Sequence, residues 1–289
     1  MKKILFSFLT IISINAIAQT PEDAIRLSWF APNGTPRSNA LGGAMGSLGG
    51  DLSSTSINPA GLGFYKTGEL YIAPQLNTNN NSFNYFGNKT SIQNSKMNIG
   101  TIGLVFTENN NRRKYKNTSF AISFTKLADY NNSYSFKGSN DYSSYLEKFA
   151  DQLYYDGASI AQAQQNYIYG SSLAYHSKLV NPVLNANGDV TDYRALVTGG
   201  VNQFYDATTT GSYNEMSFSW AGNLEDKLYL GGSIVMPMIN YSKSLNYTES
   251  YSNNNSTIFD FYENYSSKGF GLGAKLGLIY KPESYLRLG

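Results

Sequence analysis

The side chains that most often perform catalysis or bind metals are nearly absent from this chain. Its 289 residues include no cysteine and one histidine, His176. Ordinary zinc and iron sites need several His, Cys or carboxylate ligands, so we expect no metal and no cofactor. A Ser-His-Asp triad would lack the Gly-x-Ser-x-Gly segment that presents a nucleophilic serine, and the glycine runs lack the Lys-Ser/Thr of a phosphate loop. The composition predicts that the protein is not an enzyme.

Turn chemistry, in contrast, is concentrated in the segment LGGDLSSTSINPAGLGFY, residues 48–65. Its Asn-Pro-Ala-Gly has the residue preferences of a type I turn, and the proline favours extended backbone in Asn58. We expect the Asn58 side-chain oxygen to accept a hydrogen bond from a backbone N–H about two residues later. The pattern predicts a compact segment that lies inside or beneath the strands and turns into the first of them. The residues singled out here are Gly42, Gly43, Asp51, Asn58, Pro59, Ala60 and Gly61.

The first residues predict export. Residues 1–18 have two lysines, an apolar run and the small-x-small site Ala16-Ile17-Ala18, the layout of a secretory signal peptide. No later apolar run reaches the roughly 18 residues that a transmembrane helix needs. The formal net charge is only +2, without a long Lys/Arg block, so we expect no nucleic-acid partner.

Alternating side chains predict the elements that hold this segment. From Gly269 to Tyr280 one face is apolar and the other is mostly glycine, with one lysine, Lys275. The same period of two predicts strands at 67–77, 96–107, 116–136, 211–222, 227–245 and 266–280, with a seventh begun at Tyr285. With 24 Tyr and 16 Phe, this composition is typical of a transmembrane antiparallel β-barrel; an all-β periplasmic or extracellular domain is the alternative.

The predicted connections alternate between short and long. Short links at 108–114, 223–226 and 281–284 take turns with long ones at 77–96, 138–210 and 246–265, as in outer-membrane barrels with short periplasmic turns. Six and a fraction strands cannot close a barrel in lipid, so we expect an N-terminal fragment of a longer protein. The predicted organisation is a signal peptide (1–18), an N-terminal hatch or plug (19–61) and a partial barrel (62–289).

The long link at 138–210 contains a helical period, and Gly157 is a plausible end for that helix. Such a helix either caps the mouth of the barrel or offers an apolar landing surface to a ligand. The side chains that would form that surface are Leu146, Phe149, Leu153 and Tyr154.

The stretch RSNALGGAMGSLGGDLSSTSINPAGLGFY, residues 37–65, resembles the plug and first strand of the FadL-type (OmpP1/FadL/TodX) outer-membrane transport proteins. Beyond Tyr65 the resemblance is architectural only. It implies a barrel of roughly fourteen strands, about half of them present here, with a hatch in its lumen. Members from Bacteroidetes are especially similar around residues 34–54.

The resemblance implies an outer-membrane monomer that takes up hydrophobic small molecules, long-chain fatty acids or aromatic compounds, by passive, hatch-gated diffusion. The alternatives are a shuttle in type IX secretion, or a receptor for haem or another ligand. The family's lateral opening lies at a strand interruption, and the apolar alternation fails here after Phe124. We therefore assign the opening to Leu127, Asp129, Asn131 and Asn132.

Overall fold

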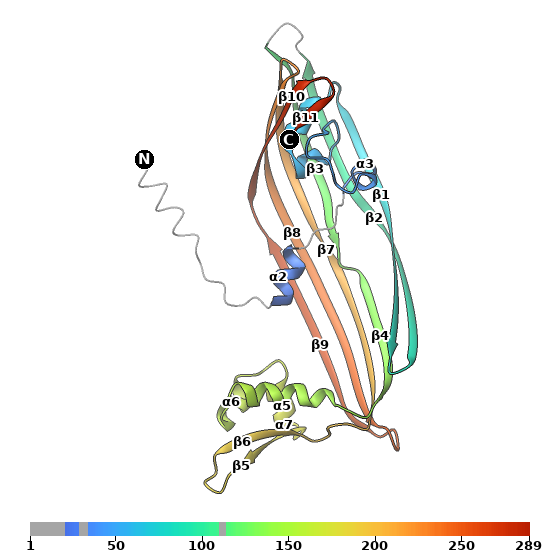
Figure 1. The fold of residues 1–289 in the computed structure, drawn as a ribbon, viewed down its shortest axis with the longest axis vertical. Coiled ribbons are helices and arrows are strands. Elements are labelled where there is room, and N and C mark those ends of the chain that lie inside the picture. Colours follow the sequence, from blue (N-terminus) through green and yellow to red (C-terminus); the bar gives the residue numbers. More distant parts are fainter. Residues whose placement is uncertain (1–20, 29–33, 110–113) are drawn as a thin grey trace, which may run out of the picture.

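A computed structural model describes residues 21–28, 34–109 and 114–289, so the predicted signal peptide lies outside the described residues. Most of the described chain forms one long antiparallel sheet that curls like half of a barrel (Figure 1). The all-β antiparallel prediction is thus confirmed. The strands of this sheet are β1 (Glu69–Tyr85), β2 (Asn88–Asn109), β3 (Tyr115–Asp129), β4 (Asn132–Asn140), β7 (Val201–Leu224), β8 (Leu228–Tyr251), β9 (Thr257–Phe270), β10 (Gly273–Glu283) and β11 (Leu286–Leu288).

Two pairs of consecutive strands each act as one interrupted long strand. The strand order is β1-β2-β3-β7-β8-β10-β11, while β4 continues β3 along β7 and β9 continues β10 along β8. The second interruption, at residues 271–272, faces Pro237, which has no N–H for the ladder. Gly271 still donates its N–H to the Pro237 carbonyl at 2.9 Å.

The strands run well beyond the predicted boundaries. Residues 77–96 were predicted as a long loop. They form the half of the β1–β2 hairpin that contains its turn, at Phe86-Gly87, where φ is 45° and 82°. Residues 201–210 and most of 246–265 also pair as strands. The loop assignments were wrong because these residues are polar on their outward face, whereas backbone pairing needs no apolar residues.

The apolar face of the sheet changes side along the strands. Near the short turns, large apolar side chains point outward from the convex face and form what we call the outer band. Its members include Leu70, Ile72, Leu104, Phe106, Phe120, Trp220, Ile234, Leu276 and Leu278, all of them exposed. In the opposite half, the apolar residues Ala207, Leu245 and Tyr247 point inward and are buried, whereas Ser244 and Thr248 point outward. The alternation of side chains therefore continues along each strand, but the apolar residues change from the outward face to the inward face.

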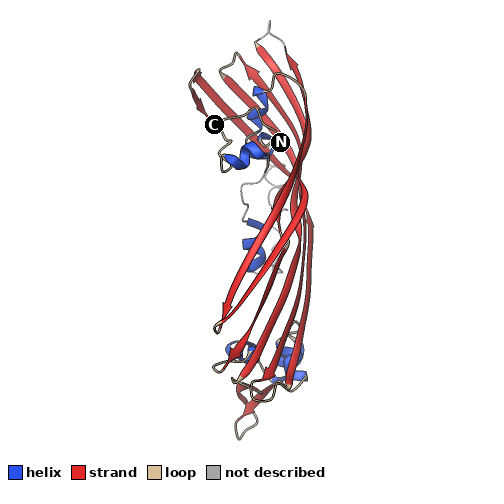
Figure 2. Ribbon diagram, turned by 90° about the vertical axis from the view of Figure 1, so that its right-hand side faces the viewer, coloured by secondary structure: helices blue, strands red, loops and turns tan. Residues whose placement is uncertain are grey.

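Within the described residues, four short helical elements precede the sheet: α2 (Pro21–Ser28), α3 (Pro36–Ala40), α4 (Ser54–Ile57) and the 3₁₀ helix η1 (Pro59–Phe64). They lie on the concave side of the sheet, with α3, α4 and η1 near the end that carries the short turns (Figure 2). We call residues 34–65 the N-terminal segment.

A small unit is inserted between β4 and β7 at the other end of the sheet (Figure 1). It comprises α5 (Tyr145–Tyr155), α6 (Ile160–Gln165), α7 (Ser171–His176) and a hairpin of β5 (Val180–Leu184) and β6 (Val190–Ala195). The predicted helix is present as α5, which begins at a Ser144–Glu147 capping box. Gly157, at φ 58°, follows its C-cap.

Candidate functional site

Asn58 fixes the N-terminal segment to the wall of the sheet. Its side-chain oxygen accepts a hydrogen bond from the Ala60 N–H at 3.2 Å, the predicted bond two residues on. Its amide nitrogen donates to the carbonyls of Gly46 at 2.7 Å and Leu278 at 3.2 Å, the latter on β10. Asn58 is extended, as expected before proline, and the Gly61 N–H returns to the Asn58 carbonyl at 2.9 Å. The predicted turn is present, continued as the 3₁₀ helix η1.

Asp51 ties the segment to itself. Its buried carboxylate accepts from the Thr35 hydroxyl at 2.8 Å and from the Ser53 backbone N–H at 2.8 Å. A carboxylate with such donors is stable away from water. Gly42 and Gly43, with φ of 61° and 80°, turn the chain after α3, a conformation that strongly favours glycine. The singled-out residues therefore all serve the fold of one compact segment.

Glycines on the inward face of the sheet let this segment approach closely. A Cβ at Gly231 of β8 would lie 2.5 Å from the Pro59 carbonyl carbon, and one at Gly277 of β10 would overlap the Asn58 side chain. Gly277 is one of the alternating glycines of residues 269–277. A glycine is needed there because the N-terminal segment occupies the space where a side chain would lie.

Polar contacts complete the attachment. The hydroxyls of Thr55 and Ser123 lie 2.8 Å apart, and Ser233 donates to the Thr55 carbonyl at 3.2 Å. Lys275, on β10, donates to both carboxylate oxygens of Glu215 at 2.7 Å and to the Ser56 carbonyl at 2.9 Å. The sequence placed Lys275 on the glycine-rich face of its strand, but it gave no sign of Glu215 as a partner because the two residues lie on strands separated by β8.

The hydrogen-bond ladder is interrupted at the predicted position. The pairing of β2 with β3 ends at Thr101 and Thr125, and the register of β3 against β7 shifts around Leu127. β3 ends at Asp129 and β4 begins at Asn132. Between them the Tyr130 N–H still donates to the carbonyl of Gly211, whose φ is 121°. The part of β2 that precedes Thr101 therefore has no backbone partner on β3 or β4.

Side chains, mainly of asparagine, bridge this gap. Asn79 donates to the Asn131 carbonyl at 3.0 Å, and Asn81 donates to the Ser133 carbonyl at 2.8 Å. Lys96 donates to the Asn131 side-chain oxygen at 2.8 Å. Sequence reasoning missed these partners because residues 77–96 were assigned to a loop, although asparagine recurs at positions 77, 79 and 81.

Asp129 is the centre of the bridge. It accepts from the amides of Asn77 and Asn98, each at 3.2 Å, from the Asn131 backbone N–H at 2.9 Å and from Lys126 at 3.2 Å. Burial opposes the charged form, but the hydrogen bonds from Asn131 and the charge of Lys126 outweigh it, so the pKa of the Asp129 carboxyl is held below its usual value. Asp129 is thus charged at neutral pH and holds both sides of the gap.

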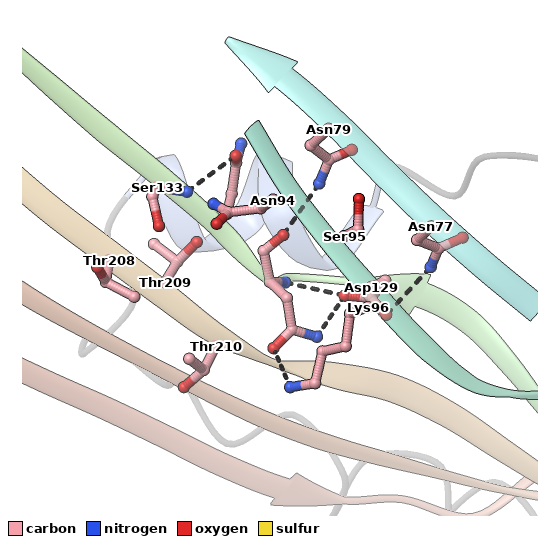
Figure 3. Close-up of a pocket in the computed structure, with 12 residues that line it drawn as sticks. Asn77, Asn79, Asn94, Ser95, Lys96, Asp129, Ser133, Thr208, Thr209 and Thr210 are labelled. Carbon is pink, nitrogen blue, oxygen red and sulfur yellow. Dashed lines mark hydrogen bonds between the residues drawn. The ribbon is translucent and has the colours of Figure 1, made fainter. Parts of the chain in front are cut away.

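A polar cavity of about 180 Å³ lies in the gap (Figure 3). Its walls include Asn77 and Asn79 of β1, Lys96 of β2, Asp129 of β3 and Thr208–Thr210 of β7. Three of the four residues assigned to the opening, Asp129, Asn131 and Asn132, line this cavity, and Leu127 lies at the register shift.

The predicted landing surface is not a surface. Leu146, Phe149 and Leu153 are buried in the core of the inserted unit, where they pack with Ala150, Tyr175 and Tyr193. That prediction was wrong for these three, because the β5–β6 hairpin and α7 supply a core that the sequence pattern did not reveal. Only Tyr154 is exposed.

Glu249 of β8 anchors the inserted unit to the sheet. Its fully buried carboxylate accepts from the Ser144 hydroxyl at 2.5 Å, the Tyr145 N–H at 2.7 Å and the Gln203 amide at 2.8 Å. The Tyr247 hydroxyl donates at 2.6 Å, and burial together with this bond raises the pKa of Tyr247 well above its usual value. The unit is therefore held to the sheet by the cap of its first helix.

His176 lies on this unit, exposed, with a ring nitrogen 3.1 Å from the Gln164 carbonyl. Within residues 21–28, 34–109 and 114–289, no three His, Cys, Asp or Glu side chains gather closely enough to hold a metal ion. Among the described helices, none is both long and apolar enough to cross a membrane. Comparisons with protein-family models, curated proteins and solved structures find no match to this chain.

Proposed function

We propose that the protein is an outer-membrane channel through which hydrophobic small molecules diffuse passively under the control of a hatch. The outer band supplies the apolar surface that lipid requires, and outward side chains beyond it are polar. A barrel in lipid has no edges, so the half-barrel would be completed by further strands. This is the arrangement that the resemblance to the FadL-type family implies.

The observation that carries the proposal is the attachment of the N-terminal segment to the concave wall. Leu52 and Leu62 are buried with Val105, Ala121 and Ala221 of the sheet, and the ring of Phe64 stacks on that of Tyr229 at 3.9 Å. Hydrogen bonds add to this packing: Asn58 to Leu278, Lys275 to Ser56, Thr55 to Ser123 and Ser233, Asn117 to Gly63 and Tyr65, and Arg287 to Leu48. The segment thus fills the concave side of the wall near the end that carries the short turns, where a ligand could pass only if the segment shifted. The N-terminal segment is therefore suited to act as a hatch.

The gap between β2 and β3/β4 is the proposed lateral opening. A backbone ladder joins the inner halves of β2 and β3, whereas side chains close this part: the amides near Asp129 and, farther along, the rings of Phe83, Tyr85, Tyr134 and Phe136. Side-chain contacts can be released by rotamer changes, so the wall should open more easily here than across a backbone ladder. The polar lining also makes the gap a barrier to a fully apolar compound until the amides separate.

Uptake measurements test the proposal. Cells or liposomes that contain the full-length protein, with its barrel closed, should accumulate a radiolabelled long-chain fatty acid, an aromatic hydrocarbon or haem faster than controls without it, and without an energy source. Rates equal to those of the control for every compound would refute it. A stable complex with secretion components, without uptake, would favour the shuttle instead.

A further inference from the structure

Three tyrosines from different parts of the sheet gather on the concave face beside the interruption of β3. They are Tyr130, between β3 and β4, Tyr241 of β8 and Tyr265 of β9, and we call them the tyrosine cage. The rings of Tyr130 and Tyr241 meet edge to face with centroids 5.5 Å apart, and those of Tyr241 and Tyr265 lie 6.0 Å apart. Tyr241 is buried. Tyr130 and Tyr265 are half-buried, so the cage is only partly open to water.

A cation of the chain itself occupies the cage. The guanidinium carbon of Arg26, on α2, lies 3.8 Å from the centre of the Tyr241 ring, and Tyr130 donates its hydroxyl to the Arg26 carbonyl at 3.4 Å. Helix α2 lies on the concave side of the sheet at this level (Figure 2). Burial raises the pKa of the Tyr130 hydroxyl, and the nearby positive charge of Arg26 opposes that rise. Arg26 therefore interacts with two sides of the cage.

The carboxylates around the cage have lysine partners. Glu263 pairs with Lys243 at 3.0 Å and Asp129 pairs with Lys126 at 3.2 Å. Farther along β7, Glu215 pairs with Lys275. Because these charges balance, the ring faces can favour a cation here. An arene face attracts guanidinium and ammonium groups by about 0.5–2 kcal/mol, and more strongly when water is excluded.

We infer that the tyrosine cage is a binding site for organic cations that carry an apolar stem, and that Arg26 competes with them for it. An arginine side chain is itself a three-carbon stem with a planar cation. The inference depends on the proposed channel only for the route by which a ligand arrives.

Calorimetry on the full chain in a non-ionic detergent tests the cage without any transport. The probe is n-butylguanidinium, and the neutral control ligand is n-butylurea. Removal of an internal competitor strengthens apparent binding, so Arg26→Ala should bind the probe about tenfold more tightly than the wild type. Adding Tyr241→Leu to Arg26→Ala should reverse this gain, whereas Tyr262→Leu, on the outer face of β9, should leave it intact.

A spin label gives a second readout, because the chain has no native cysteine. In the variant Ser28→Cys, labelled next to Arg26 on α2, n-butylguanidinium should increase the mobility of the label, and n-butylurea should not. Equal binding of the charged and neutral ligands, or tight binding that survives Tyr241→Leu, would overturn the inference. Uptake without cage binding would refute the cage alone, and cage binding without uptake would refute the channel alone.

Discussion

Lys275 lies 2.7 Å from both carboxylate oxygens of Glu215, although the two residues are on strands separated by β8. Glu215 is almost fully buried, whereas the side chain of Lys275 remains 30 % exposed. The same ammonium group donates to the Ser56 carbonyl, so one cation joins the inner wall to the N-terminal segment. This contact links the stability of the wall to the position of the proposed hatch.

Lys275→Met should destabilise the protein, because it leaves the buried Glu215 carboxylate without a cation. Loss of one partner of a fully buried pair costs about 3–5 kcal/mol, and the partial exposure of Lys275 reduces this to about 2–3 kcal/mol. The temperature at which the folded, fast-migrating band disappears from gels measures the effect. The double variant Glu215→Gln, Lys275→Met should recover part of the loss, and a double variant as unstable as Lys275→Met would argue against the pair.

Gly231→Ala should displace the N-terminal segment, because the new methyl group would lie 2.5 Å from the Pro59 carbonyl carbon. Overpacking of this kind costs about 1–3 kcal/mol. The adjacent Gly232 is the matched control: a Cβ there has its nearest neighbour at 3.6 Å, on Leu276. Limited proteolysis should cleave residues 34–65 faster in Gly231→Ala than in Gly232→Ala. Equal cleavage would place the segment elsewhere.

Asn58→Ala removes the hydrogen bonds of the Asn58 side chain to Ala60, Gly46 and Leu278, and Pro59→Gly enlarges the unfolded ensemble. Each should loosen the segment by about 1–2 kcal/mol while the sheet still assembles. Ligand flux should therefore change in both variants, with the gel mobility of the folded form unchanged. Asn80→Ala, at an exposed position of β1, should change neither quantity.

Acid should weaken the bridge across the gap. The pKa of Asp129 is lowered in the folded protein, so its stabilising contribution is complete above the unfolded value of about 3.9 and is lost as the pH falls through the lower folded value. Thermal melts between pH 7 and pH 3 should show a larger loss for the wild type than for Asp129→Asn, whose side chain does not titrate. An equal decrease in melting temperature for both proteins would show that Asp129 does not stabilise the bridge.

The sequence predicted the parts of the fold that depend on side-chain alternation or on turn chemistry. The parts of β3, β7, β8 and β10 that carry the outer band were predicted as strands. The hydrogen bond between Asn58 and Ala60 was also predicted. The halves of the strands that lie farther from the short turns were missed because the apolar side chains change face along the strand. In β7, for example, Phe218 points outward and Tyr205 points inward. Hydrogen bonds between such distant residues as Asn79 and Asn131, or Glu249 and Ser144, depend on the register of pairing, which local patterns do not encode.

A reversible cross-link between the hatch and the wall tests the central claim most directly. The hydroxyls of Thr55 and Ser123 lie 2.8 Å apart, so the variant Thr55→Cys, Ser123→Cys places two thiols within reach of a disulfide in a chain without other cysteines. Uptake of a long-chain fatty acid should stop when the disulfide forms and return when it is reduced, and uptake by each single variant should be the same under oxidising and reducing conditions. Unchanged uptake by the fully cross-linked protein would contradict hatch-gated passage.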